Sequence, residues 1–232
     1  MKISIIIPCY NEKNTIRIVV DKILKINDFD KEVIIVDDGS QDGTKEILFN
    51  DIHPLVNKVI YHDKNLGKGS AIITALKSVT GDIVVIQDAD LEYDPNEIIK
   101  LINTFLETDA DVVYGSRFLG GGKYKRIHFF WHFLANQLLT FASNILSNLN
   151  LSDMETGYKA FKTKVLKELK LEQRSFGFEP EVTMKLAMKK KIFYEVPVSY
   201  SGRSYEEGKK ITLKDAFIAL YCIFKYRFFK NY

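Results

Sequence analysis

The sequence predicts an α/β protein with a mostly parallel sheet that is covered by helices on both faces. Short apolar runs rich in β-branched residues, such as residues 83–86, are typical of strands buried on both faces. These runs alternate with amphipathic segments through the first half of the chain, and such alternation favours parallel strands joined by right-handed crossovers. The 232 residues suffice for one large domain, or for a core domain with an appendage.

The first half of the chain divides into strand–helix units. The expected strands cover residues 3–8, 32–38, 58–63, 83–86 and 111–118. The helices between them begin at residues that cap helices or turn the chain, which are Asn14, Thr44, Gly67 and Asp94. The last of these signals is the strongest, because Pro95 follows Asp94 at the first helical position.

The second half of the chain departs from this pattern. A glycine-rich basic loop covers residues 120–126, and residues 127–152 contain no Lys, Arg, Asp or Glu. This uncharged segment is long enough to span a bilayer, but its His, Asn and Gln side chains would be costly in hydrocarbon. We therefore expect a helix that lies against the sheet or in a membrane interface. The elements expected after it are a return to the globular pattern at 153–161, a helix over 180–191, a strand over 193–200 and a polar loop over 201–210.

Residues 213–232 predict a C-terminal helix that interleaves aromatic side chains with Lys225, Arg227 and Lys230. Basic and aromatic residues on one amphipathic helix suit an anionic membrane surface. A terminal helix that packs on its own domain shows the same pattern. Both alternatives remain open at this point.

The bulk composition excludes several classes of protein. The net charge of +3 does not indicate a nucleic-acid partner. Only Cys9 and Cys222 are present, which is not a disulfide framework and fits a reducing cytoplasm. The apolar segment at residues 3–7 is too short for the core of a signal peptide.

A carboxylate pair, Asp88 and Asp90, follows directly after the central strand. In an open α/β sheet, ligands bind outside the carboxyl ends of the strands. Two carboxylates placed so closely repel each other unless a cation joins them. This pattern favours a site for Mg²⁺ or Mn²⁺ that is shared with a substrate phosphate. A solvated acidic turn after a strand is the alternative.

The neighbouring strand ends carry polar residues as well. Asp37 and Asp38 offer acceptors for the N–H of a base or for ribose hydroxyls, and Tyr10 offers a ring for stacking. We therefore expect a nucleotide site beside the metal site. The positive partners expected for its diphosphate are Arg117, Arg203 and either Lys209 or Lys210. Residues 64–69 do not form a Walker loop, but their backbone N–H groups could approach a phosphate.

Eight motifs, in this order, carry a family resemblance: PCYNE, VDDGSQDGT, NLGKGSA, QDADLEYDP, YGSRF, DMETGYKAF, FGFEPE and GRSYEEGKK. Over roughly residues 2–211 the chain resembles family 2 glycosyltransferases of the GT-A fold. Within that family it is most similar to dolichol-phosphate mannose synthases and related polyprenyl-phosphate hexosyltransferases. The expected division is a GT-A domain at residues 1–211 and a C-terminal amphipathic helix at 212–232, with membrane association as one of its two alternatives.

The resemblance also implies a set of site residues. Those expected to bind the sugar nucleotide are Pro8, Tyr10, Glu12, Val36, Asp38, Asp88, Ala89, Asp90, Arg117, Arg203 and Lys209. Asp88 and Asp90 are expected to hold the metal, and Glu92 to complete its site where relatives often have glutamine. Asp90 and Asp153 are the expected catalytic residues, with Asp153 as a candidate base by its motif position. A loop-stabilising or helix-capping aspartate is the alternative for Asp153.

The function these residues predict is metal-dependent, inverting transfer of a hexose from GDP-mannose or UDP-glucose to a polyprenyl phosphate. The enzyme would attach peripherally to the cytoplasmic face of the membrane. A lipid phosphate is already largely ionised at neutral pH and needs no base, whereas a sugar-hydroxyl acceptor does. The alternatives are therefore a glycosyltransferase with a sugar-hydroxyl acceptor, which could not lose Asp153, and a non-catalytic nucleotide-binding scaffold.

Overall fold

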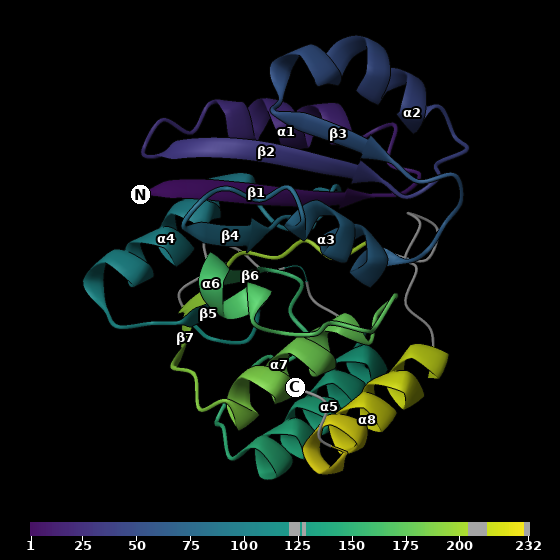
Figure 1. Ribbon diagram of the computed structural model, residues 1–232. Helices are drawn as coiled ribbons and strands as arrows, with labels where there is room; N and C mark the ends of the chain where they lie inside the picture. The colour runs from purple at the N-terminus through teal and green to yellow at the C-terminus, as the bar shows by residue number, and fades with distance from the viewer. Residues whose placement is uncertain (121–125, 127–128, 204–212, 230–232) are drawn as a thin grey trace.

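The computed structural model describes residues 1–120, 126, 129–203 and 213–229, and these residues fold around one seven-stranded sheet. The strand order is β3-β2-β1-β4-β6-β5-β7 (Figure 1). The strands are β1 (Lys2–Cys9), β2 (Asp30–Asp37), β3 (Lys58–Tyr61), β4 (Ile83–Ile86), β5 (Val112–Ser116), β6 (Lys159–Lys162) and β7 (Phe193–Pro197).

The helices connect these strands and cover both faces of the sheet. Those of the first half are α1 (Ile16–Leu24), α2 (Thr44–Ile47), the single turns η1 (Leu48–Ile52), η2 (His53–Leu55) and η3 (Pro95–Glu97), α3 (Lys68–Leu76) and α4 (Ile98–Glu107). Those of the second half are α5 (Phe130–Ser147), α6 (Thr163–Lys167), α7 (Phe178–Met188) and α8 (Leu213–Phe228).

Strand alternation divides the core into two layers. Along β1, Ile3, Ile5 and Ile7 face the core under α1 and α4, whereas Ile6 faces the core under α3, α7 and α8. Because successive side chains of a strand point to opposite faces, a fully apolar strand fills both layers. The predicted α/β class with a doubly covered, mostly parallel sheet is confirmed.

One strand runs against the others. β1 pairs in parallel with β2 and β4, but β6 lies antiparallel between β4 and β5. This places the segment before β6, residues 153–158, at the carboxyl end of β4. The sequence did not predict this inserted strand, and it brings the motif around Asp153 next to the carboxylate pair.

Most predicted boundaries agree with the structure to within a few residues. The strand expected over 58–63 ends at Tyr61, and the N-cap of α1 is Thr15 and not Asn14. Asp94 does cap its helix, because its side chain accepts a hydrogen bond from the Asn96 N–H. Most of the loops expected at 120–126 and 201–210 lies outside the described residues.

The uncharged segment forms α5, which packs with α7 and α8 in a three-helix group on one side of the sheet (Figure 1). Among the described residues, no helix combines the length and the apolar character needed to cross a membrane. Cys9 and Cys222 are both buried, and neither forms a disulfide in the described part of the chain.

Candidate active site

The site is built on the turn that follows β4. Because β1, β2 and β4 are parallel neighbours, their carboxyl ends meet at one edge of the sheet. Asp88 and Asp90 lie there, and the carboxyl of Asp90 is buried. Each carries a basic partner: Lys68 Nζ lies 2.8 Å from Asp88 Oδ1, and Arg203 Nη2 lies 2.8 Å from Asp90 Oδ2.

Arg203 joins three acidic side chains from distant parts of the chain. Besides Asp90, its guanidinium lies 3.1 Å from Glu12 Oε1 and 3.5 Å from Glu92 Oε1. Burial, with the carboxylates of Asp88 and Glu92, raises the pKa of Asp90 to about 8, and Arg203 opposes that shift. This corner of the protein therefore has an excess of negative charge that a cation stabilises.

The donor set suits a hard divalent cation only in part. Within the described residues, no three Asp, Glu, His or Cys side chains are placed to hold a metal ion by themselves. Glu92 is already engaged, accepting hydrogen bonds from the Tyr200 hydroxyl and the Arg203 N–H. Asp88 and Asp90 remain, and Mg²⁺ is commonly held by one or two carboxylates together with substrate phosphates. The residues fit such a shared site, whereas metal binding by Glu92 stays a prediction.

Arg117 and Asp153 form a buried, bidentate ion pair beside the carboxylates of Asp88 and Asp90. Arg117 Nε and Nη2 each lie 2.7 Å from an Asp153 oxygen, and the Arg117 N–H donates to the same carboxylate at 3.0 Å. Burial alone would raise the pKa of Asp153, but Arg117 outweighs it and lowers that pKa. These contacts favour the loop-stabilising alternative for Asp153, because a base needs free electron pairs and an accessible pKa.

Lys159 stabilises the loop that contains Asp153, residues 153–158. It is fully buried, and its ammonium donates to the carbonyls of Met154 and Thr156. Gly157 lies close to the carboxylate pair, since a Cβ there would lie 2.5 Å from Asp88 Oδ2. A larger residue at this position would displace the Asp88 carboxylate.

The residues expected around the nucleoside lie at the same edge but are not all exposed to it. Pro8 and Tyr10 are partly exposed at the end of β1, whereas Val36 and Ala89 are buried. Lys209 lies outside the described residues. Their roles toward a nucleotide stay predictions.

Asp38 has a structural role that the sequence did not reveal. Its carboxylate accepts the N–H groups of Leu66 and Gly67 at 3.0 and 2.7 Å and lies 2.7 Å from His62 Nδ1. It therefore fixes the loop before α3, which carries Lys68. A ribose or base contact would have to share these oxygens.

Two residues at the site, Lys68 and Glu179, were not predicted as functional. Residues 64–69 were expected to contribute only backbone N–H groups, and Glu179 directly precedes the helix expected over 180–191. In the structure Lys68 Nζ also lies 3.2 Å from Glu179 Oε1, so it links α3, Asp88 and α7. The glycines on both sides of Lys68 were the available signal, since they indicate close packing at the start of α3.

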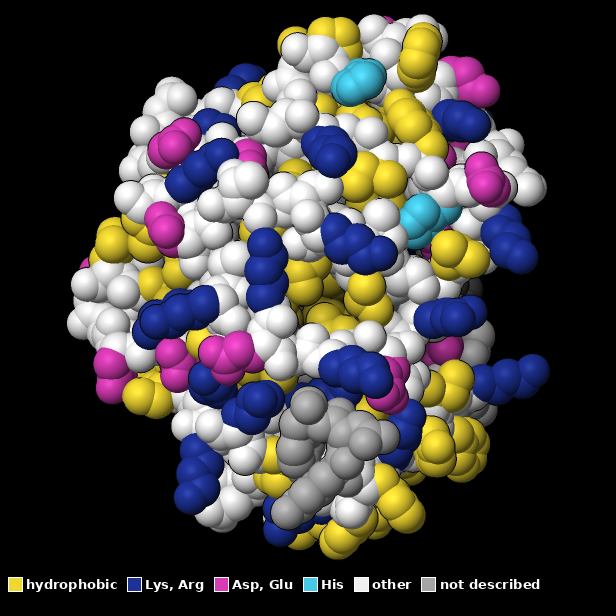
Figure 2. All heavy atoms as spheres, in the orientation of Figure 1, with side chains coloured by type: hydrophobic (Ala, Val, Ile, Leu, Met, Phe, Trp, Pro, Cys, Tyr) yellow, Lys and Arg dark blue, Asp and Glu magenta, His cyan; other side chains and the backbone are white. Residues whose placement is uncertain are grey.

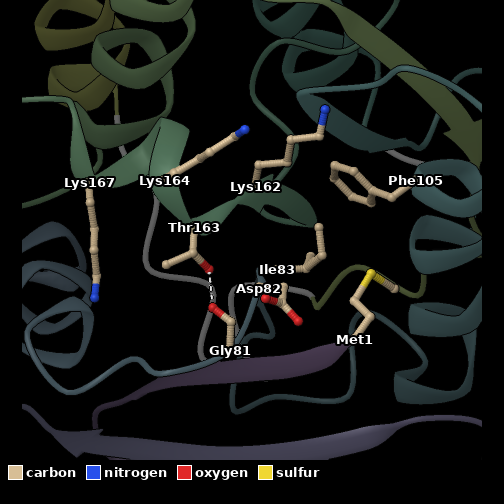
Figure 3. A pocket seen from close by; sticks show the side chains of 9 residues that line it. All are labelled: Met1, Gly81, Asp82, Ile83, Phe105, Lys162, Thr163, Lys164 and Lys167. Carbon is tan, nitrogen blue, oxygen red and sulfur yellow. Dashed lines mark hydrogen bonds between the residues drawn. The ribbon is translucent and has the colours of Figure 1, made fainter.

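A separate pocket lies at the other end of the sheet (Figure 3). It is lined by Met1, Gly81, Asp82, Ile83, Phe105, Lys162, Thr163, Lys164 and Lys167. Ile83 begins β4, so this pocket is at the amino end of the strand that carries the carboxylates at its carboxyl end. Lys162 pairs with Asp111, and Lys167 donates to the Val79 carbonyl. This pocket is not part of the candidate active site.

Comparison with solved structures gives the class of protein. Glucosyl-3-phosphoglycerate synthase from Mycobacterium tuberculosis, solved with UDP, superposes with a TM-score of 0.75 over 99% of this chain and 81% of that chain, at 19% identity. The same enzyme with Mn²⁺, UDP and glucosyl-3-phosphoglycerate gives 0.71 over 97% and 79%, also at 19% identity. The fold is that of GT-A glycosyltransferases.

Sequence comparison identifies the family. The model of glycosyl transferase family 2 matches residues 4–170. The chain belongs to this family, and it is a glycosyltransferase.

Three relatives are similar over nine-tenths of the chain. They are a dolichol-phosphate mannosyltransferase of Pyrococcus furiosus (30% identity, 90% of this chain, 59% of that one), a UDP-N-acetylglucosamine–dolichyl-phosphate N-acetylglucosaminyltransferase of Methanococcus voltae (31%, 91% and 91%) and an undecaprenyl-phosphate mannosyltransferase of Micrococcus luteus (29%, 90% and 87%). The chain thus spans about three-fifths of the Pyrococcus relative and most of the other two.

Proposed function

We propose that this protein transfers a hexose from a nucleotide diphosphate sugar to a polyprenyl phosphate, with inversion at the anomeric carbon and with Mg²⁺ or Mn²⁺. The observation that carries the proposal is the pair Asp88 and Asp90 at the carboxyl end of β4, each with a basic partner, in a chain of family 2. All three relatives described above are named for transfer to a dolichyl or undecaprenyl phosphate.

Asp88 and Asp90 are the residues that would hold the cation together with the donor diphosphate. The bound cation would supply charge neutralisation for the leaving nucleoside diphosphate. Arg203 lies within 2.8 Å of Asp90. With a cation held by the carboxylates, the Arg203 guanidinium would be available to bind the diphosphate, because its planar donors suit phosphate oxygens.

The state of Asp153 supports a phosphate acceptor over a hydroxyl acceptor. Its carboxylate is fully buried and paired with Arg117, and its pKa is lowered. A sugar hydroxyl must lose a proton to a base as it attacks. A lipid phosphate already carries the attacking charge, so an engaged Asp153 does not impede it.

The outer face of α5 supports attachment to a lipid surface. Its exposed side chains include Leu138, Phe141 and Ile145, whereas the side that packs inward presents one leucine, Leu139, and three small polar residues, Thr140, Ser143 and Ser147. Surface helices of proteins in water show the reverse arrangement. Phe141 is 63% exposed, which is costly in water and favourable in an interface of lipid headgroups and acyl chains.

Helix α8 extends this face. Ala219, Cys222, Ile223 and Tyr226 pack inward, while an aromatic stripe stays exposed. The stripe consists of Phe217, Tyr221, Phe224 and Phe228. Hydrophobic side chains gather at the lower edge of the molecule, with Lys and Arg side chains around them (Figure 2). We therefore assign residues 212–232 to attachment at an anionic membrane, on its cytoplasmic face, and residues 1–211 to catalysis.

Replacing Phe217 and Tyr221 together by serine is expected to release the protein from vesicles that contain anionic lipid. Both side chains are exposed in the structure, so folding should be unaffected and only the apolar contact with lipid should be lost. Co-sedimentation with vesicles measures the bound fraction. Phe49→Ser is the matched control, because Phe49 is equally exposed but lies on η1, remote from α8 in sequence and fold. Unchanged binding of the double variant would contradict the membrane assignment.

The proposed reaction is tested by a panel of donors and acceptors. GDP-mannose, UDP-glucose and UDP-N-acetylglucosamine are each incubated with the protein and metal, with a polyprenyl phosphate or with the polyprenol that lacks the phosphate. Transfer to the phosphate from one donor is the expected result. Metal-dependent donor cleavage without lipid product would favour a sugar-hydroxyl acceptor. No turnover with any donor, from a folded protein that still binds nucleotide, would leave the scaffold alternative.

A further inference from the structure

Lys68 and Glu179 form a buried polar pair next to Asp88. Lys68 Nζ lies 2.8 Å from Asp88 Oδ1 and 3.2 Å from Glu179 Oε1. The Lys68 ammonium is thus within ion-pair distance of two carboxylates. An ammonium carries three N–H groups, so two such contacts leave one N–H for a further acceptor.

The backbone around this pair is fixed by close packing. Asp38 holds the N–H groups of Leu66 and Gly67, and Ser70 N–H donates to the Arg174 carbonyl at 2.9 Å. Gly67 has a φ of +97°, and a Cβ there would lie 2.3 Å from the Arg174 oxygen. The start of α3 and the segment before α7 therefore interlock, which holds Lys68 and Glu179 in a preorganised arrangement.

One oxygen of Glu179 lacks a hydrogen-bond donor. The side chain is 6% exposed, and its Oε2 has no partner among the residues that the structure describes. A buried carboxylate oxygen without a donor is unfavourable, so a ligand that brings a donor would stabilise it. Asp88 and Lys68 side chains are 20% and 16% exposed, so the cluster is open on the side of the carboxylate pair.

We propose that Glu179 and Lys68 recognise, through hydrogen bonds, the hydroxyl groups of the hexose that is transferred. Glu179 Oε2 accepts a hydrogen bond from one sugar hydroxyl, and the remaining Lys68 N–H donates to a neighbouring hydroxyl oxygen. This inference rests on the proposed function, because it assumes that the donor diphosphate lies at Asp88 and Asp90. A hexose is the part of that donor which carries several adjacent hydroxyl groups next to the diphosphate.

The pair would act as a specificity determinant. A site built to bind a hydroxyl discriminates strongly against a ligand that lacks it, because the buried polar group is then left unpaired. Glu181, two residues further along, does not share this role. Its carboxylate is fully buried, pairs with Lys185 at 2.7 Å and accepts the N–H groups of Glu172 and Gln173.

Calorimetric titration separates recognition of the sugar from recognition of the nucleotide. Wild-type protein and Glu179→Gln are titrated, with Mn²⁺, against GDP, UDP, GDP-mannose and UDP-glucose. The variant is expected to bind the nucleoside diphosphate as the wild type does and to bind the nucleotide sugar about 10- to 100-fold more weakly. Monodeoxy analogues of the donor identify the hydroxyl, since one analogue should bind equally well to both proteins. Glu168→Gln, at an exposed carboxylate, is the control.

Three results would decide against the proposal. Equal affinity of Glu179→Gln and wild type for the nucleotide sugar would overturn it, and so would an equal loss for nucleoside diphosphate and nucleotide sugar. If Glu179→Gln does not fold, Glu179→Asp keeps the charge and withdraws the oxygens, and it should show the same selective loss. Failure of the wild type to bind any of the four nucleotides would instead contradict the proposed function, and this inference with it.

Discussion

Asp90→Asn is expected to lower the rate of hexose transfer by a factor of about 10²–10³ or more. In the proposed function, the Asp90 carboxylate holds the cation that neutralises the leaving diphosphate, and asparagine keeps the shape of the side chain without its charge. Steady-state transfer with saturating donor and acceptor measures the effect. Asp51→Asn, at an exposed site on η1, should leave the rate unchanged.

The same substitution is not expected to destabilise the protein. Burial and the neighbouring carboxylates raise the pKa of Asp90 to about 8, which means that the fold favours an uncharged side chain there. Asparagine meets that preference, so the melting temperature should stay equal or rise. A slow variant with a lower melting temperature would indicate a structural effect, and an unchanged rate would contradict the role of Asp90.

Asp153→Asn is expected to have the opposite signature, with a large loss of stability. It removes one partner of a buried ion pair and leaves the Arg117 guanidinium, whose side chain is 12% exposed, without its carboxylate. Breaking such a pair costs about 3–5 kcal/mol in the free energy of unfolding. Urea unfolding at neutral pH measures the difference. Asp21→Asn is the matched control, because it breaks an exposed pair with Arg17 that is worth less than about 1 kcal/mol.

The pH dependence gives this prediction a second test. The pKa of Asp153 is lowered in the fold, so the carboxylate contributes stability above its unfolded pKa of about 3.9. That contribution is lost as the pH falls through the folded value. The stability gap between wild type and Asp153→Asn should therefore be largest at neutral pH and shrink below about pH 4. A gap that does not change with pH, or no gap at all, would refute the buried-pair account.

The activity of the Asp153→Asn variant also separates the acceptor hypotheses. A folded Asp153→Asn protein, assayed well below its melting temperature, should still transfer to a lipid phosphate. Complete loss of turnover in a folded variant would instead assign a base function to Asp153, as a hydroxyl acceptor requires.

The sequence predicts the part of the fold that depends on local patterns. Apolar runs such as Ile83–Ile86 identify the parallel strands, and the position of Asp88 and Asp90 directly after that run indicates the candidate site. The antiparallel insertion of β6 was not predictable in this way. It pairs with strands more than 40 positions away in the chain, and no local pattern encodes such long-range pairing.

The contacts that the charged residues make were harder to predict than their location at the carboxyl edge of the sheet. Asp38 suits a ribose hydroxyl or a backbone N–H equally well, and the structure uses it for the N–H groups of Leu66 and Gly67. Arg203 was expected on phosphates, and in the structure it pairs with the carboxylates of Asp90 and Glu12. Lys68 and Glu179 form an ion pair only because α3 and α7 pack together, and this long-range contact is not visible in the local sequence.

The amphipathic pattern of the C-terminal helix left two alternatives open, packing on the domain and attachment to an anionic membrane. The structure shows that one side of α8 packs on the domain, with Cys222 buried, while Phe217 on the other side is exposed. Membrane attachment through the exposed side stays a prediction. Amphipathicity shows that a helix has two faces, but it does not show which surroundings each face meets.

The account depends most on the claim that Asp88 and Asp90 bind a divalent cation together with a nucleoside diphosphate. A crystal of the wild-type protein grown with Mn²⁺ and GDP or UDP tests it directly through the anomalous scattering of manganese. We predict an anomalous peak at Asp90, bridged to the diphosphate, with the Arg203 guanidinium moved from Asp90 to the phosphates. A nucleotide bound without manganese at these carboxylates, or a peak elsewhere in the protein with Arg203 still paired to Asp90, would contradict the account.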